Sequence, residues 1–167
     1  MPLVPYLGMQ PTVGEGVEID PEGFVIGKVT LGRGVRIGAR TVLRGDQDTI
    51  TVGDHVRFGR AISVHMDPSY PTRIGSEVVV EDDAIVHGTI LGDAVLVERD
   101  ATILTGSSVG EGSIVQAGSL VPEGKSFPAR SVIAGTPGKV IRETTDDEVA
   151  SIRRRARERP SGYSATP

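Results

Sequence analysis

Residues 91–121 read LGDAVLVERDATILTGSSVGEGSIVQAGSLV, and this stretch decides the fold. Aliphatic side chains recur in it every six residues, at Leu91, Val97, Ile103, Val109, Val115 and Val121. A period of six is not a multiple of the 3.6-residue helical turn, and the β-branched residues and glycines between these positions also disfavour a helix. An antiparallel meander would instead show strict alternation with turns every 8–12 residues. The pattern therefore indicates short strands that each end in a corner.

The same period runs through most of the chain. It occupies residues 13–43, 52–64, 74–86 and 91–133, which together give 20 inward positions, 18 of them Val, Ile or Leu. A six-residue period rich in glycine is typical of the hexapeptide kind of parallel β-helix. Three hexads make one triangular coil, and stacked coils bury a continuous aliphatic column. We therefore predict an all-β fold, a left-handed parallel β-helix (a hexapeptide-repeat solenoid) with a C-terminal α-helix.

The helix is predicted from the segment that follows the last repeat. Thr145-Asp146-Asp147-Glu148 forms a capping-box pattern, and apolar residues follow at helical spacing. We expect four segments: an N-terminal lead-in over 1–12, the β-helix over 13–140, the C-terminal helix packed on the solenoid over 141–158, and a disordered tail over 159–167.

The period breaks at two places by insertion. Three residues are inserted around 44–51 and four within 65–73. Insertions in a solenoid usually leave the coils as loops. We therefore expect two loops that emerge from neighbouring coils.

Composition excludes several classes of function. The net charge is −4, which does not indicate a surface for nucleic acid or for an anionic membrane. No run of 18 apolar residues is present, and the first residues do not read as a signal peptide. The chain contains no cysteine, so disulfide and thiolate chemistry are excluded. We expect a cytoplasmic protein that does not bind membranes.

The repeat also predicts which side chains share a face. Face 1, with inward residues such as Leu91 and Val109, carries a column of glycines, and face 2 includes the inward residue Val80. On face 3, the outward residues that follow the inward ones are Arg44, His65 and His87. Because stacked strands lie about 4.8 Å apart, two imidazoles on successive coils can converge on one metal ion. The alternative is a pair of histidines with ordinary hydrogen bonds.

Two further residues bear on this site. His55 falls in the middle of a hexad, so we interpret it as a corner residue on the surface. Asp82 belongs to face 2 and should not reach the histidines within one subunit. It could reach them from a neighbouring subunit packed against face 3.

Several segments together resemble the γ-class carbonic anhydrases. They are TVLRGDQDTITVGDHVRFGRAISVH, the run from YPTRIG to VERDATI that contains EDDAIVHG, GSIVQAGSLVPEGK and AGTPGKVIRETTDDE, and the resemblance covers roughly residues 10–150. The resemblance implies a homotrimer with a metal ion at each subunit interface. The ion is usually zinc, with iron or cobalt as alternatives, and three histidines bind it. It also implies a lyase that hydrates CO2 to bicarbonate by a metal-bound hydroxide.

The resemblance carries over to individual residues. His65 and His87 match two of the family's ligands, and Asp82 stands where the family has its third histidine. Zinc accepts carboxylate oxygen, so His65, Asp82 and His87 form the expected metal set. Arg44 and Asp46 match the family's interface pair beside the metal.

The chain also departs from the family's pattern. Residues 57–60 read RFGR, where the family usually has Asn-x-Gln-Asp, whose Gln and Asp position the metal-bound water. The acidic loop that supplies a proton-shuttling glutamate in some members is absent. The loop HMDPSYPTR offers only Asp67 and Tyr70 as groups that could assist.

Four functions remain open at this point. The first is a metal-dependent lyase of the carbonic anhydrase type, with Arg44, Asp46, Asp67 and Tyr70 as candidate catalytic residues. The second is a non-catalytic trimeric scaffold or binding protein. The third is a diverged hydrolase or lyase acting on another small carbonyl or carboxylate compound, which Arg44 would hold. The fourth, an acyltransferase, rests on fold analogy alone and ranks last.

Overall fold

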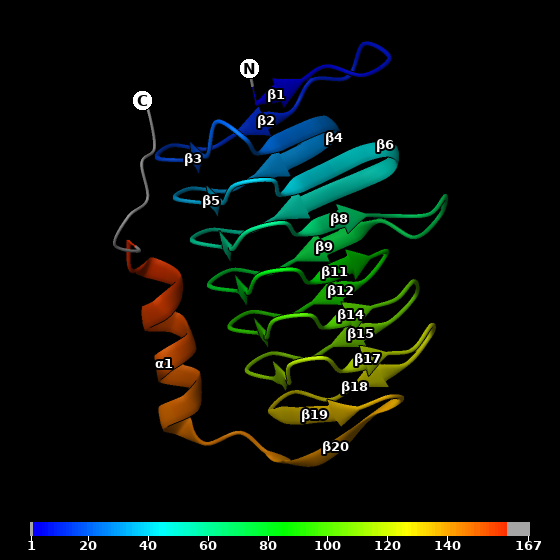
Figure 1. Cartoon of the computed structure of the whole chain (residues 1–167), viewed down its shortest axis with the longest axis vertical. Coiled ribbons are helices and arrows are strands. Elements are labelled where there is room, and N and C mark those ends of the chain that lie inside the picture. The colour runs from blue at the N-terminus through cyan, green and yellow to red at the C-terminus, as the bar shows by residue number, and fades with distance from the viewer. Residues whose placement is uncertain (1, 160–167) are drawn as a thin grey trace.

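The chain forms a parallel β-solenoid with one helix along its side (Figure 1). The structure, a computed structural model, describes residues 2–159. Strands of successive coils pair in parallel, and within residues 2–159 only the last pair of strands is antiparallel. The predicted fold class, a left-handed parallel β-helix with a C-terminal α-helix, is confirmed. The expected disordered tail lies, apart from Arg159, outside the described residues.

Three stacks of short strands form the three faces. Face 3 contains β1 (Leu3–Val4), β8 (Ser63–His65), β11 (Ile85–His87), β14 (Thr102–Ile103) and β17 (Leu120–Val121). Face 1 contains β2 (Thr12–Val13), β9 (Thr72–Ile74), β12 (Ile90–Leu91), β15 (Ser108–Val109) and β18 (Ser126–Phe127). Face 2 contains β3 (Glu18–Ile19), β5 (Arg36–Ile37), β7 (Arg57–Phe58), β10 (Val79–Val80), β13 (Leu96–Val97), β16 (Ile114–Val115), β19 (Ser131–Gly135) and β20 (Gly138–Glu143).

Two long strands join faces 3 and 1 into one sheet. They are β4 (Phe24–Leu31) and β6 (Val42–Val52), which continue around the corner without a break. The first insertion was expected to form a loop, and that expectation is wrong. Gly27 pairs with Gly45 and Val29 with Ile50, so the extra residues stay within β6 as an irregularity of its pairing with β4. Continued backbone pairing on both flanks keeps the insertion in the sheet.

The aliphatic column is buried as the period predicts. Of the 20 inward positions, 18 are buried. Val13 is the exception that contradicts the prediction, because it is 41% exposed, and Ile19 is half-buried. Both lie in the first coils, where fewer strands cover them. On face 1 the coils approach so closely that a Cβ on Gly53 would lie 2.8 Å from the backbone of Gly75, which explains the glycine column.

The two ends of the chain differ from the expected segments. The lead-in over 1–12 contributes strands, since β1 and β2 both pair with β4. At the other end, β20 runs through the expected boundary at 140, and the helix α1 spans Asp146–Arg157. Thr145 is its N-cap, and the predicted capping box with Glu148 is present. Among residues 2–159, no helix is long and apolar enough to cross a membrane.

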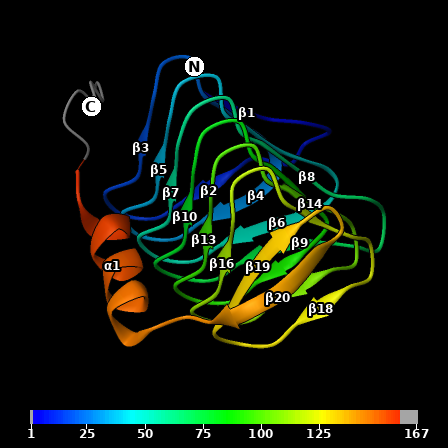
Figure 2. The same ribbon diagram turned by 60° about the horizontal axis from the view of Figure 1, so that its bottom comes forward.

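Helix α1 lies against face 2, as both ribbon views show (Figures 1 and 2). Its buried Ile152 and Ala156 pack with Leu96 and Ile114 of the solenoid. Ion pairs surround this small apolar contact: Arg153 binds Glu77 at 2.7 Å, and further pairs join Arg153 to Glu111, Arg155 to Glu81 and Arg157 to Glu77. The helix therefore covers face 2 and leaves faces 1 and 3 open.

Loss of one side chain from the aliphatic column should destabilise the whole solenoid. Ile103 is fully buried in the central coils, and we expect Ile103→Ala to lower the free energy of unfolding by about 2–5 kcal/mol, because the narrow column cannot collapse around the cavity. Chemical denaturation measures this change. The control is Val140→Ala at an exposed position of β20, which should stay within about 0.5 kcal/mol of wild type. Equal losses in both variants would contradict the assignment of the column as the core.

The capping box predicts a pH-dependent contribution to stability. Hydrogen bonds from Arg142 and from the Thr145 N–H lower the pKa of Glu148 from 4.5 to about 2. Ionised Glu148 therefore stabilises the folded chain above pH 4.5, and this stabilisation is lost as pH falls toward 2. We expect Glu148→Gln to lower Tm at pH 7, with a difference from wild type that shrinks below pH 4.5. Thermal scans across this pH range measure the difference in Tm, and Glu123→Gln at an exposed position is the control. A difference in Tm that does not change with pH would contradict the role given to ionised Glu148.

Candidate functional site

Two histidines meet on face 3, as the repeat predicts. His65 ends β8 and His87 ends β11, and the two residues are direct partners in the parallel register. Their ring centroids lie 5.1 Å apart, and His65 Nδ1 is 3.0 Å from His87 Nε2. Both rings are partly exposed, with 15% and 26% of the side-chain surface accessible. The site therefore faces outward from the solenoid.

Arg44 and Asp46 surround the far nitrogen of His65. Asp46 Oδ1 lies 3.1 Å and Arg44 Nη2 2.9 Å from His65 Nε2, and Arg44 Nε lies 3.2 Å from Asp46 Oδ2. Nε2 can donate to Asp46 or accept from Arg44, and the tautomer of His65 decides which. The insertion in β6 matters here, because Asp46 is the first residue after the paired Gly45. The predicted Arg44–Asp46 ion pair is thus present beside His65.

A threonine and a carboxylate support His87 from its other side. Thr105 Oγ1 lies 2.7 Å from His87 Nδ1 and donates to Asp67 Oδ2 at 2.8 Å. Asp67 itself is 3.8 Å from His87 Nδ1, too far for a direct hydrogen bond. Asp67 therefore reaches the histidine pair only through Thr105.

The second insertion forms the predicted loop, between β8 and β9, and Thr72 anchors it. The buried Thr72 hydroxyl donates to the His65 carbonyl at 2.7 Å and accepts from the Gly88 N–H at 3.0 Å. The loop turns tightly, with Tyr70 N–H donating to the Asp67 carbonyl at 3.0 Å. Gly88 has φ +54°, and a Cβ there would lie 3.2 Å from both Thr105 and the Tyr70 carbonyl. Glycine after His87 therefore leaves room for the groups that support the ring.

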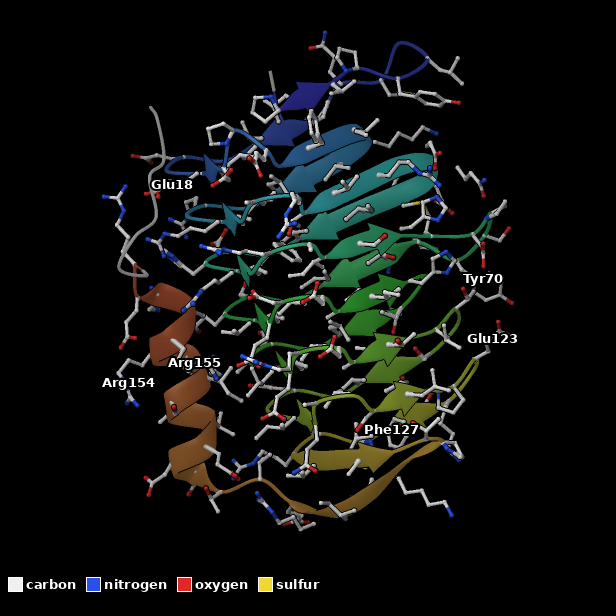
Figure 3. The ribbon with its side chains drawn as sticks, in the orientation of Figure 1. Glu18, Tyr70, Glu123, Phe127, Arg154 and Arg155 are labelled. Atoms are coloured by element: carbon white, nitrogen blue, oxygen red, sulfur yellow. The ribbon has the colours of Figure 1, made fainter. Side chains whose placement is uncertain are left out.

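A shallow pocket of about 430 Å³ opens beside this loop. Asp67, Tyr70, Thr105 and Glu123 line it, together with Gly106 and Gly124. Figure 3 shows Tyr70 and Glu123 along one edge of the solenoid, on the side away from α1. Tyr70 is 49% exposed and lies near Gly106, not against either histidine ring. Of the expected assisting groups, Asp67 joins the hydrogen-bonded network and Tyr70 lies at the pocket wall.

Asp82 lies apart from the histidines within the subunit. It occupies the corner between β10 and β11, where its Oδ1 accepts the Arg60 N–H at 2.8 Å. In residues 2–159, no three His, Cys, Asp or Glu side chains converge as a metal site. His55 also lies elsewhere, at a corner between β6 and β7 with φ +52°. One chain therefore brings together two of the three expected metal ligands.

The histidine pair fits a shared divalent metal ion. Two ligand atoms on tetrahedral zinc, with bonds of about 2.0–2.1 Å, lie about 3.3–3.4 Å apart. His65 Nδ1 and His87 Nε2 come within a few tenths of an ångström of that spacing. If His65 donates Nε2–H to Asp46 and His87 donates Nδ1–H to Thr105, the lone pairs of His65 Nδ1 and His87 Nε2 face each other. A cation between them would relieve that contact, so the two histidines suit a shared metal ion.

Sequence reasoning missed Thr105 and Thr72. Both are ordinary threonines in hexads, and the repeat alone predicts no role for them. Thr105 follows Leu104, the next outward position after His87 in the column. The sequence held one indication of its role: the Thr105 hydroxyl comes directly after the position that stacks on the expected ligand His87.

Comparison with known proteins places the chain among named relatives. It is 37% identical over 144 residues to the "probable carbonic anhydrase" of Methanocaldococcus jannaschii, covering 86% of this chain and 91% of the relative. It is 34% identical to the mitochondrial gamma carbonic anhydrase 1 of Arabidopsis thaliana over 85% of this chain, but spans only 54% of that protein. The carnitine operon protein CaiE of Escherichia coli is 32% identical, over 86% of this chain and 74% of the relative.

A solved structure has the same fold. A hexapeptide transferase family protein from Anaplasma phagocytophilum superposes with a TM-score of 0.87 at 33% identity, covering 92% of this chain and 91% of the other. No family model matches the chain. The archaeal relative aligns along nearly its whole length at an identity that shows common family membership. The chain therefore belongs to the γ-carbonic anhydrase-like family of hexapeptide-repeat proteins.

Proposed function

We propose that this protein is a homotrimer that binds one divalent metal, zinc or another such as iron or cobalt, at each subunit interface. His65 and His87 of one subunit would hold the ion, and Asp82 of the neighbouring subunit would supply the third ligand. The observation that carries this proposal is the 3.0 Å approach of His65 Nδ1 to His87 Nε2, with the outer nitrogen of each ring hydrogen-bonded. We also propose a cytoplasmic location, which the cysteine-free sequence permits.

A mainly apolar row of outward side chains supports placing the interface on face 3. The positions just before the inward residues of this face are, in register order, Phe24, Val42, Ser63, Ile85, Thr102 and Leu120, so four of the six are apolar. Phe24 is 39% exposed and Ile85 43% exposed. A second subunit would bury these side chains and would bring its own corner residues toward the histidines. Face 2 is already covered by α1, and of the two open faces, face 3 carries the histidine pair, so face 3 is the better candidate for the contact.

The reaction that fits this site best is hydration of CO2 to bicarbonate. When bound, the metal supplies a nucleophile by lowering the pKa of a coordinated water. Arg44 would attract the anionic product and hold one of its oxygens, because its guanidinium is half-exposed beside the histidines. Asp46 keeps Arg44 and His65 in place. Asp67 and Tyr70, at the adjoining pocket, would exchange protons or hydrogen bonds with solvent.

A second candidate uses the same pocket on a small carboxylate or carbonyl compound. Arg44 Nη2 contacts His65 and Nε contacts Asp46, whereas Nη1 makes no hydrogen bond among residues 2–159, and half of the side-chain surface is exposed. A guanidinium presented in this way suits a carboxylate of the substrate. Assays with simple esters, thioesters and CO2 on the same metal-loaded preparation separate the two reactions. A trimer without any metal would leave only the scaffold or binding role.

Metal content tests the proposed site directly. We expect about one metal ion per subunit in protein purified without an affinity tag, and loss of that metal in His65→Ala and in His87→Ala, because each removes a nitrogen ligand. Elemental analysis after gel filtration measures it. The matched control is His55→Ala, the remaining histidine, which should keep the metal. Absence of metal from wild type, even after reconstitution, would refute the metal site.

Mixed trimers test whether the third ligand crosses the interface. Asp82→Ala alone should lose most of the metal. When Asp82→Ala subunits are unfolded and refolded together with His87→Ala subunits, some interfaces combine intact Asp82 with intact histidines. We expect these mixed trimers to recover part of the metal, whereas either variant refolded alone recovers none. If Asp82→Ala retains full metal content, the third ligand is not Asp82.

A further inference from the structure

The hydroxyl of Thr105 has one proton, and its surroundings determine where that proton lies. Thr105 Oγ1 is 2.7 Å from His87 Nδ1 and 2.8 Å from Asp67 Oδ2. An ionised carboxylate can only accept hydrogen bonds, and Asp67 faces solvent with 49% of its side chain exposed. The Thr105 proton therefore points to Asp67. Its oxygen is left to accept, and the group that must donate to it is His87 Nδ1–H.

The contact between the two rings has one proton, and the Thr105 contact decides which ring supplies it. With its own proton on Nδ1, His87 presents an Nε2 lone pair to His65, so in the metal-free protein His65 Nδ1–H donates to His87 Nε2 and His65 Nε2 accepts from Arg44. If His65 instead donates Nε2–H to Asp46, its Nδ1 lone pair would face the His87 Nε2 lone pair at 3.0 Å, a contact that requires a cation between the two nitrogens. The Thr105 contact thus places the proton of His87 on Nδ1. Nε2 then keeps the lone pair that a cation would use.

We infer that Thr105, held by Asp67, is the positioning residue that fixes His87 as the Nδ1–H tautomer and so presents Nε2 to the space between the two histidines. Its effect on metal binding rests on the proposed function. Its effect on the tautomer does not. Gly88 makes the arrangement possible, because a Cβ at that position would lie 3.2 Å from Thr105 Oγ1.

Each histidine thus has its own carboxylate, reached in a different way. Asp46 lies directly on His65 Nε2, whereas Asp67 acts on His87 through a hydroxyl. Outer groups of this kind orient metal-binding imidazoles, and their loss typically costs 10–100-fold in metal affinity. Thr105 therefore has a measurable role that a purely structural threonine would not have.

The tautomer of His87 in metal-free protein is the first measurement. Two-bond ¹H–¹⁵N correlation of the imidazole ring, recorded at a pH where both histidines are neutral, distinguishes Nδ1–H from Nε2–H. We expect the Nδ1–H form in wild type and in Thr105→Ser, which keeps the hydroxyl. In Thr105→Val the oxygen that accepts from His87 Nδ1–H is lost. The hydrogen bond between the two histidines can then reverse, with His87 Nε2 as the donor, so the Nε2–H form of His87 should become populated. An Nε2–H form in wild type, or an unchanged tautomer in the valine variant, would overturn the inference.

Zinc affinity, measured by competition with a chromophoric chelator, is the second readout. We expect Thr105→Val to bind zinc about 10–100-fold more weakly and Thr105→Ser to bind close to wild type. Thr30→Val is the control, since Thr30 is exposed on β4 and its hydroxyl has no hydrogen bond among residues 2–159. Should the valine variant fail to fold, Asp67→Asn on the exposed loop replaces it, because it removes the charge that holds the Thr105 proton. It should then shift the His87 tautomer in the same direction.

The two readouts separate the two proposals. If wild type binds zinc and Thr105→Val has the same zinc affinity and the same His87 tautomer, the role of Thr105 is refuted and the proposed metal site stands. Wild type that binds no metal refutes the proposed function, and the tautomer then decides the role of Thr105 by itself.

Discussion

The parallel stacking of coils is the constraint on which the rest of this structure depends. Each inward aliphatic residue is covered only because the next coil repeats the same register, so the column from Val25 to Ile133 is buried as one unit. The same register places every outward side chain about 4.8 Å from its counterpart on the next coil. His65 and His87 meet for this reason and need no folding of distant segments toward each other. A solenoid thus forms a site from side chains at equivalent positions of successive coils, whereas most folds form one where loops converge.

Stacking also explains how much could be predicted. The six-residue period predicted the fold, the buried positions and the neighbourhood of Arg44, His65 and His87, because each follows from counting along one chain. It failed at Val13, where the end of the stack leaves an inward residue exposed, and at the first insertion, which stays paired within β6. The six-residue period does not predict the hydrogen bonds of a segment that departs from it. Thr72 and Thr105 were missed for the same reason, since their roles depend on the path of the loop after His65.

The geometry that joins two histidines also keeps the third expected ligand away from them. Asp82 follows β10 on face 2, and its carboxylate is occupied by the Arg60 N–H at the corner. A side chain on another face cannot cross the filled interior of the solenoid. If Asp82 is the third ligand, as proposed, it would complete the set only where the corner of one subunit meets face 3 of another. Metal binding and assembly would then be coupled, since neither partner alone offers three ligands.

The residue at position 82 also bears on which chemistry this site would favour. A carboxylate ligand in place of an imidazole lowers the net charge around the metal, and a bound water becomes a weaker acid. The neighbouring segment also departs from the family pattern: Gly59 and Arg60 stand where the resemblance leads one to expect the water-positioning Gln and Asp, and the backbone N–H of Arg60 donates to Asp82. Arg60 in place of the family's Asp would add positive charge to this segment, whereas Asp82 adds a negative charge at the proposed ligand itself. A bound water that is a weaker acid would slow the hydration of CO2, so retention of a small carboxylate by Arg44 is the property in which this chain would differ most from the family pattern.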